Sequence, residues 1–283
     1  MRQIIYSPHY DFYVDKIRRT SDYAMKTFHF HRKYEIYYLS EGMRRVFIDN
    51  SAYLVSAGNI VIIDKDQIHK TGPAASMPHT RYVLNFNPKY LSSAWGEEKV
   101  DSLISFFTQG VHVLTVQMKT QNYVENLLQR LICLNDVESA ESELLRKCLL
   151  TELLVCLKKC VSKQIQSNIG EPQKIRNDTV SQVFAYISKN YQEPLSLAQI
   201  AAQLYISPCY LSHLFKKNTG LSIVEYLNSV RVRAAKQYLE TTNLKITEIT
   251  DKVGFCTASH FSRVFKAGTG LAPNVYRKYY RKE

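Results

Sequence analysis

One short element occurs twice in the C-terminal third of the chain, and this repeat constrains the fold more than any other feature. The copies contain "YISPCYLSHLFKKNTG" at 205–220 and "GFCTASHFSRVFKAGTG" at 254–270. Positions before the turn repeat at an offset of 49 residues and positions after it at an offset of 50. The extra residue is therefore placed in the turn, since loops tolerate insertions best. The matched positions are Leu197, Ile200, Ala201, Leu204, Leu211, Leu214, Phe215, Gly220 and Tyr226 in the first copy, and Ile246, Ile249, Thr250, Val253, Phe261, Val264, Phe265, Gly270 and Tyr276 in the second.

Each copy is predicted to be a helix-turn-helix unit. Apolar residues at i, i+3, i+4 and i+7 predict a short core-facing helix before the turn. After it, Ser207 offers an N-cap, Pro208 suits the first helical position and Gly220 suits the helix end. We expect the units at about 197–217 and 246–267, joined by a longer helix over about 222–239. Their second helices should enter major-groove segments roughly one turn of DNA apart.

The outward positions of the two second helices combine small, polar and basic side chains. They are Cys209, Ser212, His213, Lys216 and Lys217 in the first unit, and Ala258, Ser259, Ser262, Arg263 and Lys266 in the second. Base contacts near the helix start, followed by cations for phosphates, suit a DNA-binding helix. The net charge of +12 agrees, because residues 178–283 hold fourteen basic and seven acidic side chains. The alternative is two helical hairpins whose basic residues are merely solvated.

The segment "VGFCTASHFSRVFKAGTGLAPNVYRKYY" strongly resembles the C-terminal signature of AraC/XylS-type transcriptional regulators, and the resemblance covers about 180–282. It implies that Cys209, Ser212 and His213 contact bases in the first unit, and Ala258, Ser259, Ser262 and Arg263 in the second. A serine is common in the family where this chain has Cys256, so we expect the N-cap at Thr257. The implied partners are double-stranded promoter DNA, a second copy of the chain and RNA polymerase. Activation and repression both stay open.

The N-terminal part is predicted to be antiparallel β structure, which makes the whole a multi-domain α+β protein. Residues 26–87 are rich in Tyr, Val and Ile between turn signals, which favours a small sandwich or barrel. Residues 119–163 follow a helical period broken by "NDVESAESE". One face of this helix pair should pack on the barrel, and a second face could serve a dimer. We expect a barrel at 1–118, the helix pair at 119–163, a linker at 164–178 and the DNA-binding domain at 179–283.

A histidine motif in the first strands suggests chemistry inside the barrel. "HFHRKYEIYYLSEG" has the spacing of the first motif of cupin barrels, whose histidines and glutamate can bind a divalent metal. The second cupin motif is degraded, because Asp64, Asp66 and Pro73 depart from it. A site of His29, His31, Glu35 and His69 is one interpretation. A polar pocket without metal is the favoured one, and a structural role is the third. The metal site is also the only support for a rival function, a metal-dependent cupin enzyme.

The same region resembles the sensor domains of regulators of sugar uptake and catabolism, in "YEIYYLSEGMRRVFI", "IHKTG" and "PHTRYVLNF". The resemblance implies a small effector, a carbohydrate or its metabolite. Strand alternation places Glu35 and Tyr37 on one side, and Arg81 and Asn85 on one side, without showing which side is inside. Trp95 is predicted to be ordinary packing rather than a sugar platform. The expected effector-binding residues are His29, His31, Glu35, Tyr37, Arg44, His69, His79 and Arg81.

The remaining features point to a cytoplasmic regulator rather than an enzyme with a cofactor. The start of the chain lacks the apolar run of a secretory signal, and no stretch is long and apolar enough to span a membrane. The six cysteines include no C-x-x-C pair, so we expect buried free thiols. We expect a one-component transcription factor in which effector binding shifts how the two DNA-binding units are presented.

Overall fold

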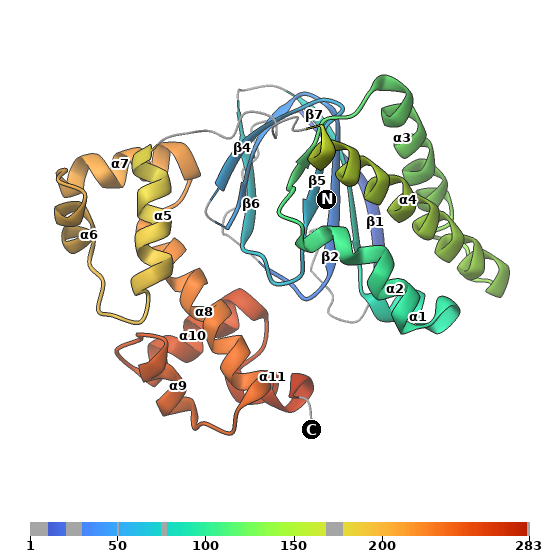
Figure 1. Ribbon diagram of the computed structural model, residues 1–283. Helices are drawn as coiled ribbons and strands as arrows, with labels where there is room; N and C mark the ends of the chain where they lie inside the picture. The colour runs from blue at the N-terminus through green and yellow to red at the C-terminus, as the bar shows by residue number, and fades with distance from the viewer. Residues whose placement is uncertain (1–10, 21–29, 50, 75–77, 168–177, 282–283) are drawn as a thin grey trace.

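The computed structural model describes residues 11–20, 30–49, 51–74, 78–167 and 178–281. Figure 1 shows a strand-rich part with covering helices, followed by a part made of helices. This arrangement confirms the expected α+β fold class. None of the helices in the described ranges combines the length and the apolar character needed to cross a bilayer.

The strands form two antiparallel sheets. The five-stranded sheet has the order β1 (Phe12–Arg19), β7 (His79–Phe86), β2 (Tyr34–Glu41), β5 (Ile60–Ile63) and β8 (Val113–Leu114). The three-stranded sheet has the order β4 (Ser51–Ser56), β3 (Met43–Ile48) and β6 (His69–Pro73). The expected barrel is not closed, because the strands of the described residues form two separate hydrogen-bonded sheets. The result is an open sandwich.

Strand alternation gives each sheet an inner and an outer face. The inner faces form an apolar cluster of Tyr37, Leu39, Val46, Ile48, Tyr53, Val55, Val61, Ile63, Val83 and Val113. The outer face of the five-stranded sheet packs against helices that lie on that side (Figure 1). On the opposite side, Phe47, Ala52 and Ile68 belong to the same core as the C-terminal helices. The three-stranded sheet therefore lies between the sandwich interior and the helical part.

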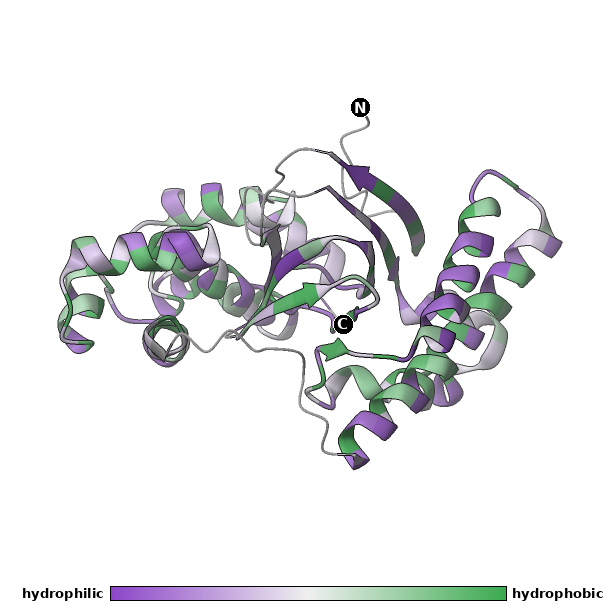
Figure 2. Ribbon diagram, turned by 90° about the horizontal axis from the view of Figure 1, so that it is seen from above, coloured by the Kyte–Doolittle hydropathy of each residue, from purple (hydrophilic) through white to green (hydrophobic). Residues whose placement is uncertain are grey.

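The helices on the five-stranded sheet are α1 (Pro88–Trp95), α2 (Glu97–Ile104), a short 3-10 helix (Ser105–Thr108), α3 (Met118–Cys133) and α4 (Ala140–Gln166). The predicted helix pair corresponds to α3 and α4, whereas α1 and α2 are too short to give a clear period. Apolar and polar residues alternate around the helices of both parts, as amphipathic helices require (Figure 2). Trp95 packs in this layer and donates its Nε1–H to Thr151 Oγ1 at 2.9 Å, which places it outside the sandwich interior.

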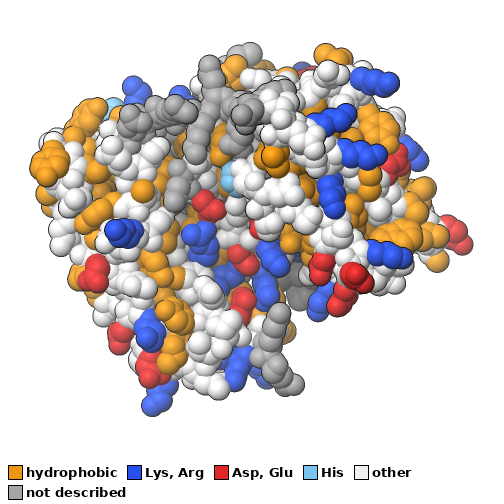
Figure 3. Space-filling model, viewed as in Figure 1, with side chains coloured by type: hydrophobic (Ala, Val, Ile, Leu, Met, Phe, Trp, Pro, Cys, Tyr) orange, Lys and Arg blue, Asp and Glu red, His pale blue; other side chains and the backbone are white. Residues whose placement is uncertain are grey.

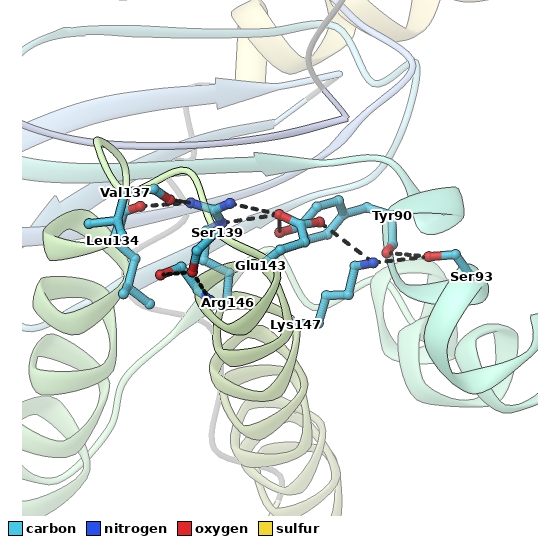
Figure 4. A network of polar contacts seen from close by, with 9 residues as sticks. Tyr90, Ser93, Leu134, Val137, Ser139, Glu143, Arg146 and Lys147 are labelled. Carbon is cyan, nitrogen blue, oxygen red and sulfur yellow. Dashed lines mark hydrogen bonds and ion pairs between the residues drawn. The ribbon is translucent and has the colours of Figure 1, made fainter.

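A polar network fixes the turn between α3 and α4 and joins it to α1 (Figure 4). Arg146 donates from Nη1 to the carbonyl of Leu134 at 2.6 Å and from Nη2 to Glu143 at 2.7 Å. The Tyr90 hydroxyl of α1 donates to the same carboxylate at 3.2 Å. Because a guanidinium can satisfy carbonyls and a carboxylate together, one arginine closes the turn. The helix pair is thus a defined hairpin.

The C-terminal helices are α5 (Asp178–Asn190), α6 (Leu197–Gln203), α7 (Pro208–Thr219), α8 (Ile223–Thr241), α9 (Ile246–Lys252), α10 (Ala258–Thr269) and α11 (Pro273–Tyr280). Of the predicted linker at 164–178, residues 164–166 belong to α4, and 168–177 lie outside the described residues. All six cysteines are free, but the expectation that they are buried is wrong. Their side chains are exposed or partly exposed, and on α4 the leucines beside Cys148, Cys156 and Cys160 fill the core instead.

Candidate DNA interface and charged sandwich interior

The first predicted helix-turn-helix unit is formed by α6 and α7. The Ser207 side chain accepts a hydrogen bond from the backbone N–H of Tyr210 at 3.2 Å, with Pro208 at the first position of α7. At the other end, Gly220 has φ +72° and donates its N–H to the carbonyl of Lys216 at 2.7 Å. The predicted N-cap, proline and glycine stop are confirmed, so local sequence alone sets the bounds of this helix.

The second unit, α9 and α10, repeats the first with one added residue. The Thr257 side chain accepts from the N–H of His260 at 3.2 Å, which confirms the N-cap expected there. The left-handed turn position is Tyr205 in the first unit, with φ +56°, and Gly254 in the second, with φ +83°. These positions keep the offset of 49, so the added residue is Cys256, between the turn and the cap. The insertion thus lies where the sequence placed it.

Helix α8 and the second unit's turn both contact the short segment between α5 and α6. Buried Arg231 of α8 donates from Nε to the carbonyl of Tyr191 at 2.7 Å and from Nη2 to the carbonyl of Glu193 at 2.7 Å. A Cβ added at Gly254 would lie 2.6 Å from the carbonyl oxygens of Tyr191 and Gln192. Residues 191–193, which precede the first unit, therefore contact both α8 and the turn of the second unit. These contacts fix the position of one unit relative to the other.

The predicted DNA-contacting residues lie on outward faces of α7 and α10. Exposed are Cys209, His213, Lys216, Lys217, Ser259, Arg263 and Lys266, whereas Ser212, Ala258 and Ser262 are half-buried. The apolar residues Leu211, Phe215, Phe261 and Phe265 of the same helices are buried. Each helix thus presents small and polar groups near its start and cations toward its end, an arrangement suited to a DNA surface.

The interior of the sandwich is charged at the end nearest Glu35. His31 Nε2 lies 3.1 Å and His69 Nε2 lies 3.7 Å from Glu35 Oε2. Burial alone would raise the pKa of Glu35, but the hydrogen bonds and charges of the two imidazoles outweigh it and hold that pKa well below its usual value. His31 Nδ1 lies 2.9 Å from the carbonyl of Lys33, and His69 Nδ1 lies 2.8 Å from that of Gln67. Because a carbonyl only accepts, both Nδ1 atoms donate, and both Nε2 atoms face the carboxylate.

This arrangement fits a divalent cation as well as a hydrogen-bonded triad. One ligand atom from each of His31, Glu35 and His69 lies within 4.8 Å of the others. Two imidazoles oriented by backbone carbonyls, with one carboxylate, form a common ligand set for zinc or iron. A cation there would be held by these three groups and would supply Lewis acidity. Without a cation, the same geometry is a polar cluster in which the Nε2 atoms of both imidazoles face the Glu35 carboxylate. The fourth expected ligand, His29, lies outside the described residues.

The other end of the interior is basic. Arg44 of β3, His79 and Arg81 of β7 are all buried there, next to Tyr37 of β2. The Arg81 guanidinium lies 5.5 Å from the centroid of the Tyr37 ring. Burial, together with the charges of Arg44, Arg81 and Arg19, lowers the pKa of His79 to about 4. The sequence did not show which side of β2 and β7 is interior. The structure shows that Tyr37 and Arg81 both face inward.

A contact that sequence analysis missed joins the three-stranded sheet to the DNA-binding part. Lys70 Nζ of β6 donates to the carbonyl of Gly220, which ends α7, at 3.0 Å. Asp49 pairs with Arg233 of α8 at 2.5 Å, and Asp66 pairs with Lys236 of the same helix. Figure 3 shows acidic and basic side chains gathered between the two parts. Strand alternation in β6 could have predicted that Lys70 faces away from the sandwich interior, since His69 and Lys70 must point to opposite faces of the sheet.

A sandwich with a charged interior, attached to two helix-turn-helix units on a shared helix, defines a DNA-binding protein with a ligand-binding domain. Two known domain families match the chain: an AraC-like ligand binding domain over residues 13–154 and a helix-turn-helix domain over residues 200–279. The chain therefore belongs to the AraC family of transcriptional regulators.

Relatives agree with this assignment. The Msm operon regulatory protein of Streptococcus mutans is 28% identical over 245 residues, which cover 87% of this chain and 84% of the relative. An uncharacterized HTH-type transcriptional regulator of Escherichia coli, YijO, is 38% identical over 98 residues, 35% of each chain. This chain also spans only 31% of an uncharacterized Staphylococcus aureus regulator. Among solved structures, an apo form of ToxT from Vibrio cholerae aligns over 96% of this chain and 98% of its own, with 18% identity and a TM-score of 0.42.

Proposed function

We propose that this regulator binds a small effector between its two sheets and changes its affinity for promoter DNA in response. The proposal rests on the position of segment 64–70, which contacts both the charged interior and the DNA-binding part. It contributes His69 to the charged interior, and its neighbours Asp66 and Lys70 bond to α8 and to the end of α7. A group bound at one face of this segment is thus one residue away from the DNA-binding part.

The proposed mechanism follows from a series of polar contacts that joins His69 to α8. His69 Nδ1 donates to the carbonyl of Gln67, and the side chain of Gln67 donates to Asp49 at 3.2 Å. Asp49 in turn binds Arg233 of α8 and accepts at its carbonyl from the hydroxyl of Tyr226 at 3.3 Å. A ligand that reorients His69 would therefore alter the partners of α8, the helix shared by both units. The effect is a shift between two arrangements that bind DNA differently.

The effector proposed here is a carbohydrate or its metabolite. The sandwich interior offers buried hydrogen-bonding and charged groups beside an aromatic ring, the mixture that sugar hydroxyls and sugar faces require. These groups are Glu35, Tyr37, His69, His79, Arg44 and Arg81, with His31 at the edge.

A homodimer through the helix pair is the proposed assembly. Leu144 and Leu145 of α4 are exposed, and Val155 lies further along the same helix with its side chain partly in solvent. Apolar side chains at such positions are typical of a surface that another chain covers. RNA polymerase is the further proposed partner at promoters. Sedimentation of the full chain tests the dimer, and a monomer at micromolar concentration would contradict it.

The experiment that tests the function is a selection of genomic fragments by the purified full chain at physiological salt, with and without a panel of sugars. We expect a discrete site with two half-motifs about one helical turn apart, because each unit reaches one major-groove segment. A sugar should then change the apparent Kd for that site. Binding without sequence preference under all conditions would contradict the proposal. Lys216→Ala serves as a control that weakens binding to every sequence alike.

The rival function, a metal-dependent enzyme, rests on the ligand set of His31, Glu35 and His69. Relatives named as transcriptional regulators and the paired helix-turn-helix units favour regulation. Stoichiometric metal in the purified protein, with turnover that a chelator abolishes, would support the rival.

A further inference from the structure

Two arginines from opposite sheets are buried at one end of the sandwich interior. Arg44, on β3 of the three-stranded sheet, is 2% exposed, and Arg81, on β7 of the five-stranded sheet, is 8% exposed. His79 lies beside them, and its ring is influenced by both guanidinium groups and by that of Arg19. Positive charge from three strands, β1, β3 and β7, therefore converges on one buried place.

The acids of the interior do not neutralise Arg81. Glu35 is paired with Asn85, and Asn85 lies four residues from Arg81 along β7, so their backbones are about 14 Å apart at roughly 3.4 Å per residue. Its carboxylate is engaged by His31 and His69. Asp15 of β1 accepts from the Tyr13 hydroxyl at 2.9 Å, and the largely exposed Glu41 accepts from Thr80 and faces Arg18. Throughout the described residues, no carboxylate lies within 4.0 Å of Arg81.

Buried polar atoms at this end also lack hydrogen-bond partners in the described part of the chain. Both ring nitrogens of His79 and Nε of Arg81 are of this kind. A buried guanidinium without a counter-charge is costly in a folded protein, so such groups are retained where something else satisfies them. The planar guanidinium fork fits the oxygens of a carboxylate or a phosphate, to which it can donate two parallel hydrogen bonds.

We propose that the effector carries an anionic group, a carboxylate or a phosphate, which binds between Arg44 and Arg81 with His79 as a further hydrogen-bonding partner. This inference rests on the proposed function and narrows its effector to an acidic sugar, such as a sugar acid or a sugar phosphate. The sugar ring would lie along Tyr37, toward Glu35. Because the two arginines come from different sheets, the anion would join them, and β3 lies in the sheet that contacts α8.

The first test needs no effector. Arg81→Met replaces the guanidinium by an apolar chain of similar length, and Arg18→Met on neighbouring β1, with a side chain 69% exposed, is the matched control. In the ligand-free full chain we expect the melting temperature to rise in Arg81→Met and to stay unchanged in Arg18→Met. A marked fall in Arg81→Met would assign the arginine a structural role and overturn the inference.

The second test uses D-glucuronate, D-glucose 6-phosphate and D-glucose at matched ionic strength, with melting temperature and calorimetric Kd as readouts. At least one anionic probe should raise the melting temperature of the wild type and of Arg18→Met more than glucose does. Its Kd should be at least tenfold weaker in Arg81→Met. A response to glucuronate alone identifies a carboxylate, and a response to the phosphate alone identifies a phosphate. If neither anionic probe exceeds glucose, the inference is overturned.

DNA binding separates this inference from the proposed function. If an anionic probe binds through Arg81 but leaves the Kd for the selected DNA site unchanged, the inference stands and the proposed function fails. If glucose changes the DNA affinity equally in the wild type and in Arg81→Met, the proposed function stands and the inference fails.

Discussion

A methyl group at Gly254 tests the turn that positions the second recognition helix. The backbone there has φ +83°, which costs a residue with a Cβ about 1 kcal/mol. The added Cβ would also lie 2.6 Å from two carbonyl oxygens, those of Tyr191 and Gln192, so the segment between α5 and α6 must move. Weakening, rather than breaking, the two bonds of Arg231 to that segment adds about 1–2 kcal/mol, since each intact hydrogen bond from a charged group contributes about 1.5–3 kcal/mol. We expect Gly254→Ala to destabilise the protein by roughly 2–3 kcal/mol.

The repeat supplies a matched control. Tyr205 occupies the same turn position in the first unit, with φ +56° and a side chain 95% exposed. Tyr205→Gly removes the strain of a left-handed tyrosine but adds freedom to the unfolded chain, so its effect should stay within about 0.5 kcal/mol. Urea unfolding followed by circular dichroism measures both variants. A neutral Gly254→Ala would refute the close contact on which the fixed spacing of the two units depends.

Three further predictions concern the sandwich interior and the DNA surface. His79→Gln should flatten the pH dependence of folding stability. In the wild type the pKa of His79 is about 4 when folded and 6.5 when unfolded, so the folded state binds fewer protons. The wild type should therefore lose up to roughly 3 kcal/mol of folding stability as the pH falls from 6.5 to 4. Melting curves between pH 7 and 4 would show it, and parallel curves for both proteins would contradict it. Arg263→Ala should cost about 1–3 kcal/mol on the selected DNA site and relax its specificity, whereas Lys266→Ala should weaken all sequences alike and reduce the salt slope by about one. Equal losses on random DNA would refute the assigned roles. Zinc should raise the melting temperature of the wild type more than that of Glu35→Gln, because the variant lacks the carboxylate shared by both imidazoles. Equal responses would exclude this ligand set.

The DNA-binding part was predicted closely because its signals are local. Helix caps, a proline, two glycines and a repeated apolar stripe each act within one turn of helix, so Ser207 could be assigned as an N-cap from the local sequence alone. The assignment of Thr257 rested on the family resemblance, because Cys256 stands where a serine is common. Tyr205 was missed as a left-handed position because tyrosine rarely adopts that conformation, and only comparison with Gly254 at the same offset reveals it.

The sandwich was predicted less completely because its signals depend on partners distant in sequence. Alternation placed Tyr37 and Arg81 each on one side of a strand, but only the pairing of the sheets and the helices on the outer face decide that both sides are interior. The same holds for Lys70. Alternation within β6 could place Lys70 on the opposite face from His69, but it could not show that this lysine reaches the carbonyl of Gly220, 150 residues further along the chain.

The strength of the contact between the sandwich and α8 determines whether an effector can act through it. The ion pairs of Asp49 with Arg233 and of Arg32 with Glu240 are partly exposed, and pairs of this kind contribute about 0–1 kcal/mol each. A ligand present at a hundredfold excess over its Kd stabilises the arrangement it prefers by about 2.7 kcal/mol. The binding energy of a ligand is therefore comparable to the energy of these two ion pairs, so under the proposed mechanism an effector that prefers one position of His69 could break or strengthen the pairs on α8. The buried contacts of Phe47, Ala52 and Ile68 with the C-terminal core would persist and keep the two parts together.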